Sequence, residues 1–371
     1  MESFSKENPE INIKLVETPN DQHGQTMRTQ LQAGNAPDLF YVTAGRGITQ
    51  SFGALADAGY LEELTAHAWA TDTVPDPAKS LYYDEDRLFA MPVDLAPLGQ
   101  LTNIGALEEM DLKPAATFDE VLGQCEAARQ AGKALFGLAG ASAANTGMHA
   151  MQVAASTVYA KDADWDDKRQ KKETTFAGSD WKKVLERIVQ MKDAGCYQDG
   201  VAGAGFDQLF PSVAQGKVTA AFTPAGAVAA LRKQVADGQF EIAIFPGDRT
   251  SDSRMIATPV NALAVNAAGK NKESALKFLE FLAKPANQDA LAKLNGNVSM
   301  TAALAGTNPT QFPTLEPYFE DPANIISQPN LAWPNSGVFD ALGAGIQGLL
   351  TGQATPEGVL EAMDEAYDRG A

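Results

Sequence analysis

Short apolar runs alternate with longer segments of helical periodicity along this chain, and this alternation limits the possible folds more than any other feature. Each run has the length and composition of a buried β-strand. The runs are LFYV at 39–42, ALFGL at 134–138, VTAAF at 218–222, FEIAIF at 240–245 and NALAV at 261–265. Strands that alternate with helices are typical of sheets covered by helices on both faces. The sequence therefore predicts an α/β fold with mostly parallel sheets.

Two of the helices are marked by their ends. Thr117 and Glu120 form a capping box, which satisfies free backbone amides at the start of a helix that reaches about Ala131. A second helix begins after Ser179 and is ended by Gly195. Its apolar stripe, at helical spacing, consists of Trp181, Val184, Leu185, Ile188 and Met191. Both helices are expected to pack on a sheet.

The length of 371 residues exceeds the size at which one hydrophobic core keeps growing, so two lobes are expected. Residues 87–103 are interrupted by Pro92 and Pro97, which predicts an extended segment that crosses between the lobes. Near the amino terminus, apolar and polar residues alternate over residues 11–16, which predicts a strand.

Charge and cysteine content narrow the classes of function. The formal net charge of -18 disfavours binding to nucleic acid or to an anionic membrane, and it suits a neutral or cationic small ligand. No run approaches the roughly 20 apolar residues that cross a bilayer. The two cysteines, Cys125 and Cys196, are too few for a disulfide framework or a metal site, so both are expected to be small buried apolar residues.

Catalytic and cofactor motifs are missing from the sequence. The three histidines, His23, His67 and His149, include no pair at metal-binding spacing. There is no nucleophile elbow, phosphate loop or dinucleotide fingerprint, and AGAGF at 202–206 is interpreted as a Gly-rich turn. We therefore expect no metal and no cofactor. Carboxylates are abundant, so a glycoside hydrolase remains an alternative.

A series of segments runs from one end of the chain to the other. It comprises FSKENPEINIKLV, AGNAPDLFYV, GALADAGYLEEL, LTNIGALEEMDLKPAATFDEVLGQCEA, DWDDKRQKKETTFAGSDWKKVLERIVQMKDAGCY, FDQLFPSVAQGKVTAAF, NKESALKFLEFLAKPANQDALAK and LLTGQATPEGVLEAMDEAYDR. In this order the segments resemble the extracellular solute-binding proteins of carbohydrate ABC importers. That family includes maltose-binding protein and the multiple-sugar, raffinose and xylo-oligosaccharide receptors. The fourth segment is the most specific, because it is similar to the family's strand, Asn, helix, turn and Pro-x-Thr-Phe/Trp helix start.

The resemblance implies two α/β lobes of the type II periplasmic-binding-protein fold, which exchange chain segments. Residues 1–105 and 256–310 would form the N-terminal lobe, and residues 106–255 and 311–371 the C-terminal lobe. Such a protein holds a sugar or oligosaccharide between its lobes, and hinge closure changes the surface that the membrane permease reads. It is not an enzyme, and a monomer is expected. It works outside the cytoplasm, in the periplasm or lipid-anchored at the cell surface, and no signal sequence opens this chain.

Two departures from the family pattern stand out. Family members start with a strand ahead of the first helix, whereas this chain begins at that helix, so the first strand of the N-terminal lobe is expected to be missing. The family also places a Trp in the segment that corresponds to TPAGAV, where this chain has Val228. Aromatic stacking on a sugar is therefore expected from other residues.

Three candidate ligand residues are expected in the N-terminal lobe. Thr43 and Arg46 follow the strand LFYV, where the family often places polar ligand contacts; ordinary loop roles are equally compatible with the sequence. Asp94 lies in the proline-interrupted crossing, and its two carboxylate oxygens suit vicinal sugar hydroxyls. Its alternative role is structural, at the hinge.

Five further candidates are expected in the C-terminal lobe. Asn145 and His149 follow the strand ALFGL in a loop of small residues, and His149 fits a core or surface position better than a ligand contact. Thr223 ends the strand VTAAF, where a helix cap before Pro224 is an equal alternative. Trp333, between two prolines, is the preferred aromatic platform. Phe339 is a second aromatic candidate, with helix packing as its alternative.

A receptor of similar fold for another solute is the second alternative to a sugar receptor. Iron sites need paired tyrosines, and phosphate esters need several Arg or Lys side chains. The candidate loops supply neither set.

Overall fold

A computed structural model describes residues 1–235, 237–307 and 311–370 of the chain. The backbone divides into two compact units. Unit 1 comprises residues 1–95, 259–294 and 298–307, and unit 2 comprises residues 96–258, 295–297 and 311–370. Two long strands, β4 (Met91–Asn103) and β8 (Met255–Val265), each lie partly in both units, because the boundaries fall inside them. The crossing segment expected at 87–103 is therefore an extended strand for most of its length.

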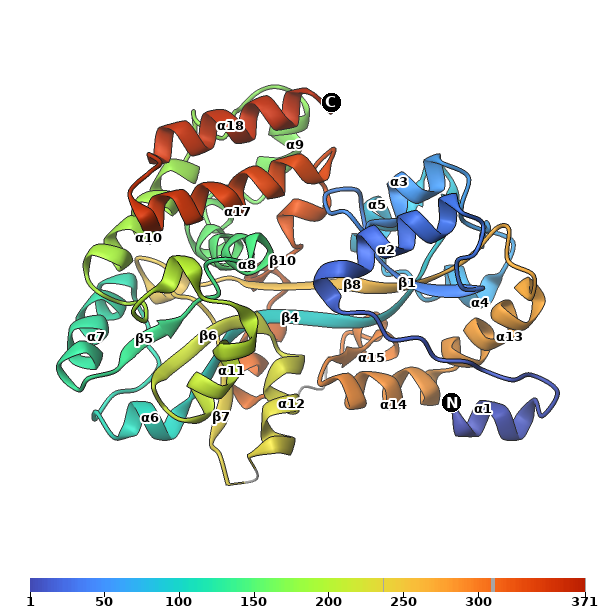
Figure 1. The fold of residues 1–371 in the computed structure, drawn as a ribbon, viewed down its shortest axis with the longest axis horizontal. Helices are drawn as coiled ribbons and strands as arrows, with labels where there is room; N and C mark the ends of the chain where they lie inside the picture. Colours follow the sequence, from blue (N-terminus) through green and yellow to red (C-terminus); the bar gives the residue numbers. More distant parts are fainter. Residues whose placement is uncertain (236, 308–310, 371) are drawn as a thin grey trace. The chain divides into compact units, whose positions relative to one another are not determined.

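Unit 1 contains short helices around a small sheet (Figure 1). Its helices are α1 (Glu2–Glu7), α2 (Asn20–Gln32), α3 (Phe52–Asp57), α4 (Ala68–Thr71), η1 (Asp76–Ala78), α5 (Lys79–Tyr82), α13 (Lys272–Ala283), α14 (Pro285–Asn295) and α15 (Met300–Leu304). Its strands, besides parts of β4 and β8, are β1 (Leu39–Thr43), β2 (Tyr83–Asp84), β3 (Arg87–Leu88) and β9 (Val298–Ser299).

Three strand pairs of unit 1 are antiparallel. Strand β1 pairs with β8 so that Thr43 lies opposite Asn261. Strand β9 pairs with β4, where Ser299 lies opposite Asp94. Strand β2 pairs with β3 in a separate hairpin. Polar side chains of β1, β4 and β8 are thereby brought to one part of the unit.

Unit 2 contains α17 (Ser336–Thr351), a helix of 16 residues, together with further helices (Figure 1). The further helices are α6 (Ile104–Glu108), α7 (Phe118–Gln130), α8 (Ala143–Ala154), which continues into the π-helical turn η2 (Ala155–Tyr159), α9 (Trp165–Gln170), α10 (Trp181–Asp193), η3 (Val201–Gly203), α11 (Phe206–Ala214), α12 (Gly226–Gln234), η4 (Thr250–Asp252), η5 (Pro313–Leu315), α16 (Glu316–Phe319), η6 (Pro322–Asn324), η7 (Pro329–Leu331) and α18 (Pro356–Asp368). Its further strands are β5 (Ala134–Gly137), β6 (Val218–Pro224), β7 (Phe240–Ala243) and β10 (Ile325–Ile326).

The sheet of unit 2 is mixed, which corrects the expectation of mostly parallel sheets. Strand β5 is parallel to β6, and β10 is parallel to β8. Strand β4, however, is antiparallel to both β6 and β7. The sequence could not distinguish these cases, because a buried apolar run reads the same in either direction and the chain connection decides the direction. The α/β class itself is confirmed.

The two helices marked in the sequence form as predicted. Helix α7 starts where the Thr117 hydroxyl accepts a hydrogen bond from the Glu120 amide at 3.3 Å, and the Glu120 carboxylate accepts from the Ala116 amide at 2.8 Å. Helix α10 buries its apolar stripe. After it, Gly195 has a φ of 70°, a left-handed conformation that favours glycine and ends the helix.

An aromatic cluster lies in the core of unit 2. Trp181 contacts Trp165, Phe176 and Trp333, with ring centroids 5.4–6.0 Å apart and steeply inclined planes. These rings are almost completely buried. Edge-to-face contacts of this kind add stability beyond the burial of area.

Cys125 and Cys196 form a disulfide, so the expectation of two separate buried thiols is wrong. The bond joins α7 to the segment after α10 across 71 residues of sequence. Both cysteines are fully buried, as expected, but they are bonded to each other and not present as free thiols. Spacing alone gave no signal, because pairing depends on how closely the fold brings the two Cα atoms together.

The strand expected at 11–16 is also wrong. These residues adopt no helix or strand, and the Leu15 and Val16 side chains are 62% and 60% exposed. Alternation of apolar and polar residues makes a strand only when another strand offers hydrogen bonds. Among the described residues, none pairs with this segment.

Candidate functional site

In unit 1, a chain of hydrogen bonds connects three side chains of neighbouring strands. The Tyr41 hydroxyl on β1 donates to Asn261 Oδ1 on β8 at 2.9 Å. Asn261 Nδ2 in turn donates to Asp94 Oδ1 on β4 at 2.8 Å. Asp94 is fully buried, while Tyr41 and Asn261 are half-buried. The network therefore runs from a buried carboxylate outward to groups that solvent can reach.

The electrostatics of this network keep its phenols protonated. Burial, followed by the negative charge of Asp94, raises the pKa of Tyr41. Burial also raises the pKa of Tyr82, which lies outside the network and whose hydroxyl donates to the Pro259 carbonyl at 2.5 Å. Both tyrosines therefore act as hydrogen-bond donors over the whole physiological pH range.

The other two candidates of unit 1 are engaged in local contacts. Thr43 is buried, and its hydroxyl lies 3.3 Å from that of Ser51. The Arg46 guanidinium forms ion pairs with Asp57 at 2.5 Å and with Asp84 at 2.9 Å. These carboxylates raise the pKa of Arg46 and neutralise its charge locally. Thr43 thus lies beside the network through its pairing with Asn261, whereas Arg46 belongs to a separate ion-pair cluster.

In unit 2, Asn145 connects the ends of two parallel strands. Its Oδ1 accepts from the Ala139 amide at 2.8 Å, and its Nδ2 donates to the Phe222 carbonyl at 3.0 Å. Ala139 follows β5 and Phe222 lies in β6, so the amide acts as a bridge at the carboxyl ends of both strands. Asn145 is fully buried, and both ends of its side chain are used by the protein.

Thr223 and His149 lie beside this bridge. Thr223 is buried, and its hydroxyl finds no hydrogen-bond partner in the part of the chain that the structure describes. The His149 ring packs 4.0 Å from the Phe222 ring, and its Nε2 lies 3.4 Å from the Tyr197 hydroxyl. Burial lowers the pKa of His149 to about 3, so the imidazole is neutral at physiological pH. Asn145, His149 and Thr223 are therefore gathered around Phe222.

The aromatic candidates lie elsewhere in unit 2. Trp333 is 1% exposed, its ring packs against Phe176 and Trp181, and its Nε1 donates to Asp166 at 3.3 Å. In this structure it presents no open ring face, and its role as a ligand platform stays a prediction. Phe339 on α17 packs closely over Gly147 on α8, where an added Cβ would come within 2.5 Å of its ring. This contact fits the helix-packing alternative.

Sequence reasoning missed Tyr41 and Asn261 as members of the unit 1 network. Tyr41 belongs to the apolar run LFYV and was assigned to strand packing. Asn261 is the one polar residue of the run NALAV and lies within β8. A polar side chain within a buried strand needs a partner, and that need was the available signal.

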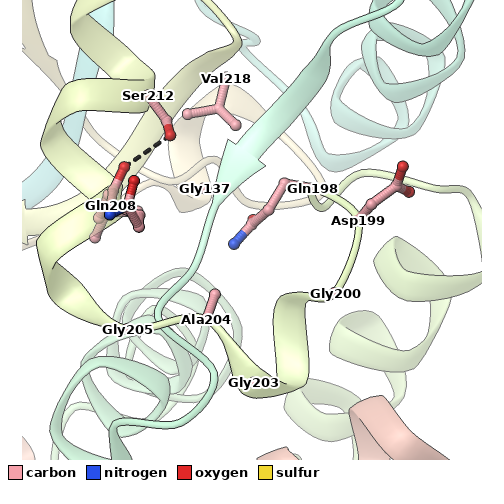
Figure 2. A pocket seen from close by; sticks show the side chains of 11 residues that line it. Gly137, Gln198, Asp199, Gly200, Gly203, Ala204, Gly205, Gln208, Ser212 and Val218 are labelled. Carbon is pink, nitrogen blue, oxygen red and sulfur yellow. Dashed lines mark hydrogen bonds between the residues drawn. The ribbon is translucent and has the colours of Figure 1, made fainter.

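A separate pocket of about 400 Å³ lies in unit 2 (Figure 2). Its wall includes the Gly-rich turn before α11 and one face of α11 itself. The lining residues are Gly137, Gln198, Asp199, Gly200, Gly203, Ala204, Gly205, Gln208, Leu209, Ser212 and Val218. None of the eight predicted ligand residues lines it.

The polar groups of this pocket are largely occupied by the protein. Gln198 uses both ends of its amide on the backbone of Leu138, at 3.1 Å and 2.7 Å. The Ser212 hydroxyl donates to the Gln208 carbonyl at 2.7 Å. In Figure 2 the Asp199 carboxylate points away from Gln198. The pocket therefore offers few free groups to a polar ligand.

Neither a metal-binding cluster nor a membrane-spanning helix is found among the residues that the structure describes. No group of three or more His, Cys, Asp or Glu side chains in the described ranges is arranged to hold a metal ion. None of the helices that the structure describes is both long and apolar enough to cross a membrane.

Known proteins resemble this chain over most of its length. Residues 2–289 match the family described as bacterial extracellular solute-binding protein. The chain is 25% identical over 383 aligned residues to the melibiose/raffinose/stachyose-binding protein MelE of Bacillus subtilis (strain 168), an alignment that covers 99% of this chain and 84% of MelE.

Solved structures share the fold. The solute-binding protein RafE in complex with raffinose superposes with a TM-score of 0.76 and 20% identity, covering 99% of this chain and 94% of RafE. A sugar transporter protein from Bacillus licheniformis in complex with stachyose gives a TM-score of 0.75 and 24% identity, covering 100% and 94%. The α/β architecture and the match over residues 2–289 confirm the resemblance found in the sequence, and the chain belongs to the bacterial extracellular solute-binding protein family.

Proposed function

We propose that this chain is the sugar-binding component of an ABC importer, which captures an oligosaccharide and delivers it to a membrane permease. The observation that carries the proposal is the similarity to MelE over 99% of the chain, since the name of that relative specifies melibiose, raffinose and stachyose. The fold shared with raffinose- and stachyose-bound proteins adds support. An α-galactoside of the raffinose series is therefore the first ligand to test.

The side chains of the candidate residues support a neutral ligand. The one cationic candidate, Arg46, already pairs with Asp57 and Asp84, so it is poorly suited to bind a phosphate or carboxylate ligand. Asn261 instead offers a side-chain amide, which is a usual partner of sugar hydroxyls. Capture by closure of two lobes, as the family resemblance implies, stays a prediction.

The disulfide supports an extracytoplasmic location. Disulfides such as Cys125–Cys196 persist in oxidising compartments and are rare in the cytosol. We propose that the protein works on the outer side of the cytoplasmic membrane as a monomer, in the periplasm or lipid-anchored at the cell surface. The absence of catalytic turnover is part of the same proposal.

Calorimetry with a sugar panel tests the proposal. Raffinose, stachyose and melibiose are titrated into the full chain, followed by xylo-oligosaccharides, chito-oligosaccharides, spermidine and glycerol phosphate. We expect saturable binding of at least one oligosaccharide with no new product after long incubation. Release of monosaccharides at catalytic rates would support a glycoside hydrolase instead. Binding of spermidine or glycerol phosphate but no sugar would assign the chain to another solute.

A further inference from the structure

The hydrogen-bond chain of unit 1 has a fixed direction. Asp94 Oδ1 accepts a hydrogen bond from an N–H group of the Asn261 side-chain amide. Asn261 Oδ1 is then turned toward Tyr41, which can only be its donor. Each residue thereby determines the orientation of the next, and reversal of the Asn261 amide would place its oxygen against the Asp94 carboxylate.

The oriented amide of Asn261 keeps one donor and one acceptor available. A side-chain amide carries two N–H groups and an oxygen with two lone pairs. The contact with Asp94 uses one N–H group, and the contact with Tyr41 uses one lone pair. Within the described ranges, no other partner of this amide is found. Asn261 is half-buried, whereas Asp94 is fully buried, and these two remaining groups are what the Asn261 amide has for a ligand. A sugar hydroxyl, which both donates and accepts, matches this pair.

Asp94 offers a ligand no exposed group. It is fully buried and lies opposite Ser299 of β9, and the adjacent Leu95 lies opposite Val298. A ligand hydroxyl cannot reach a carboxylate with no exposed surface. The sequence predicts a direct ligand contact at Asp94. Asn261, to which Asp94 is hydrogen-bonded, is better placed for that contact.

The position of Asn261 suits a ligand contact. It lies opposite Thr43, at the end of β1 where polar ligand contacts were expected. Asn261 is the third residue of β8 inside unit 1, and Asp94 is the last but one residue of β4 in the same unit. Both strands continue from these points into unit 2. The network thus sits where the chain leaves unit 1.

We propose that Asn261 contacts a sugar hydroxyl directly and that Asp94 is a positioning residue, which selects the orientation in which Asn261 presents one donor and one acceptor. The inference rests on the proposed sugar-binding function and deepens it. Asn261 should prefer a ligand hydroxyl over an ether oxygen, a carboxylate or a hydrogen atom. Only a hydroxyl can both accept from the remaining N–H group of Asn261 and donate to its remaining lone pair.

Exchanging the side chains of Asp94 and Asn261 tests whether this pair serves ligand binding or only the stability of the fold. In the double variant Asp94→Asn/Asn261→Asp, the new amide at position 94 can donate to the new carboxylate at position 261, which still accepts from Tyr41. The hydrogen-bond chain is restored, but position 261 no longer carries an N–H group. A structural role predicts that both thermal stability and sugar affinity recover. The proposal predicts that stability recovers while affinity stays reduced.

The measurements are the dissociation constant for raffinose and for stachyose by calorimetry, and the thermal midpoint by circular dichroism, on the full chain. Asn261→Ala and the exchanged double variant should each bind about tenfold more weakly than the unchanged protein, as expected for one lost hydrogen bond. Asp94→Asn alone should also weaken binding, because the Asn261 amide is then no longer held in one orientation.

A second Asn–Asp pair in unit 1 provides the matched control. Asn271 Nδ2 donates to Asp38 Oδ2 at 3.0 Å, outside the network. The exchange Asp38→Asn/Asn271→Asp should leave sugar affinity unchanged. If the unchanged protein binds the sugar and the folded Asn261 variants bind it equally well, the inference is overturned while the proposed function stands. Full recovery of affinity in the exchanged variant overturns it too. If the unchanged protein binds no sugar, the proposed function itself fails.

Discussion

Reduction of the disulfide should weaken unit 2 selectively. The Cys125–Cys196 bond spans 71 residues, and closing a loop of this length restricts the unfolded chain by an entropy equivalent to about 4 kcal/mol at 25 °C. Some of this stabilisation is lost if the reduced unfolded state keeps structure, so a decrease of about 2–4 kcal/mol in the free energy of unfolding is expected. Both sulfur atoms remain in the reduced protein, so the comparison creates no cavity.

Tryptophan fluorescence during urea unfolding reports the effect. Three of the four tryptophans, Trp165, Trp181 and Trp333, lie in unit 2, and Trp69 lies in unit 1. The fluorescence midpoint should fall to lower urea after reduction with dithiothreitol under unfolding conditions. The double variant Cys125→Ala/Cys196→Ala should show a low midpoint that dithiothreitol does not change. Thiol titration confirms that the disulfide is reduced. If the urea midpoint of the reduced protein is then unchanged, the reasoning is refuted.

Two further predictions concern the aromatic core of unit 2. Trp333→Ala should lower the free energy of unfolding by about 3–5 kcal/mol, because it empties a buried aromatic position, while Trp333→Phe should lose much less. Unchanged stability with loss of sugar binding would instead favour the ligand-platform role. Burial raises the pKa of Asp166 to about 7 from an ordinary value of 3.8, against hydrogen bonds from Tyr159 and Trp333. Because the folded state holds this proton more tightly, the contribution of Asp166 to the free energy of unfolding should be highest below about pH 4 and should be lost as the pH rises to about 7. The difference in urea midpoint between the unchanged protein and Asp166→Asn should therefore change across this range in favour of the variant; an identical pH profile in the two proteins would contradict it.

Local features of the fold were predictable because they depend on neighbouring residues. The capping box at Thr117 and the stripe of α10 each act within a few turns of one helix, and both appear in the structure as predicted. The strands of VTAAF and ALFGL are likewise set by local burial. The direction of β4 relative to β6 was not predictable, because it depends on where the chain enters the sheet.

The candidate site was less predictable because its groups are distant in sequence. Tyr41 and Asn261 are 220 positions apart, so no pattern in either segment shows that their side chains meet. Cys125 and Cys196 present the same difficulty over a shorter distance. The sequence shows Trp333 as an aromatic residue between prolines. It does not show that Phe176 and Trp181, from two other segments, bury the Trp333 ring.

The bridge made by Asn145 restricts which side chains position 145 can accept. The Asn145 side-chain amide accepts from the Ala139 amide after β5 and donates to the Phe222 carbonyl in β6, as a backbone peptide group would. A side chain without both groups would leave either the Ala139 amide or the Phe222 carbonyl unsatisfied, so few substitutions are tolerated. Thr223 is the adjacent residue, and its hydroxyl is committed to no protein partner in the described part of the chain. A substitution at position 223 therefore breaks no side-chain hydrogen bond within the described residues, whereas a substitution at position 145 breaks two.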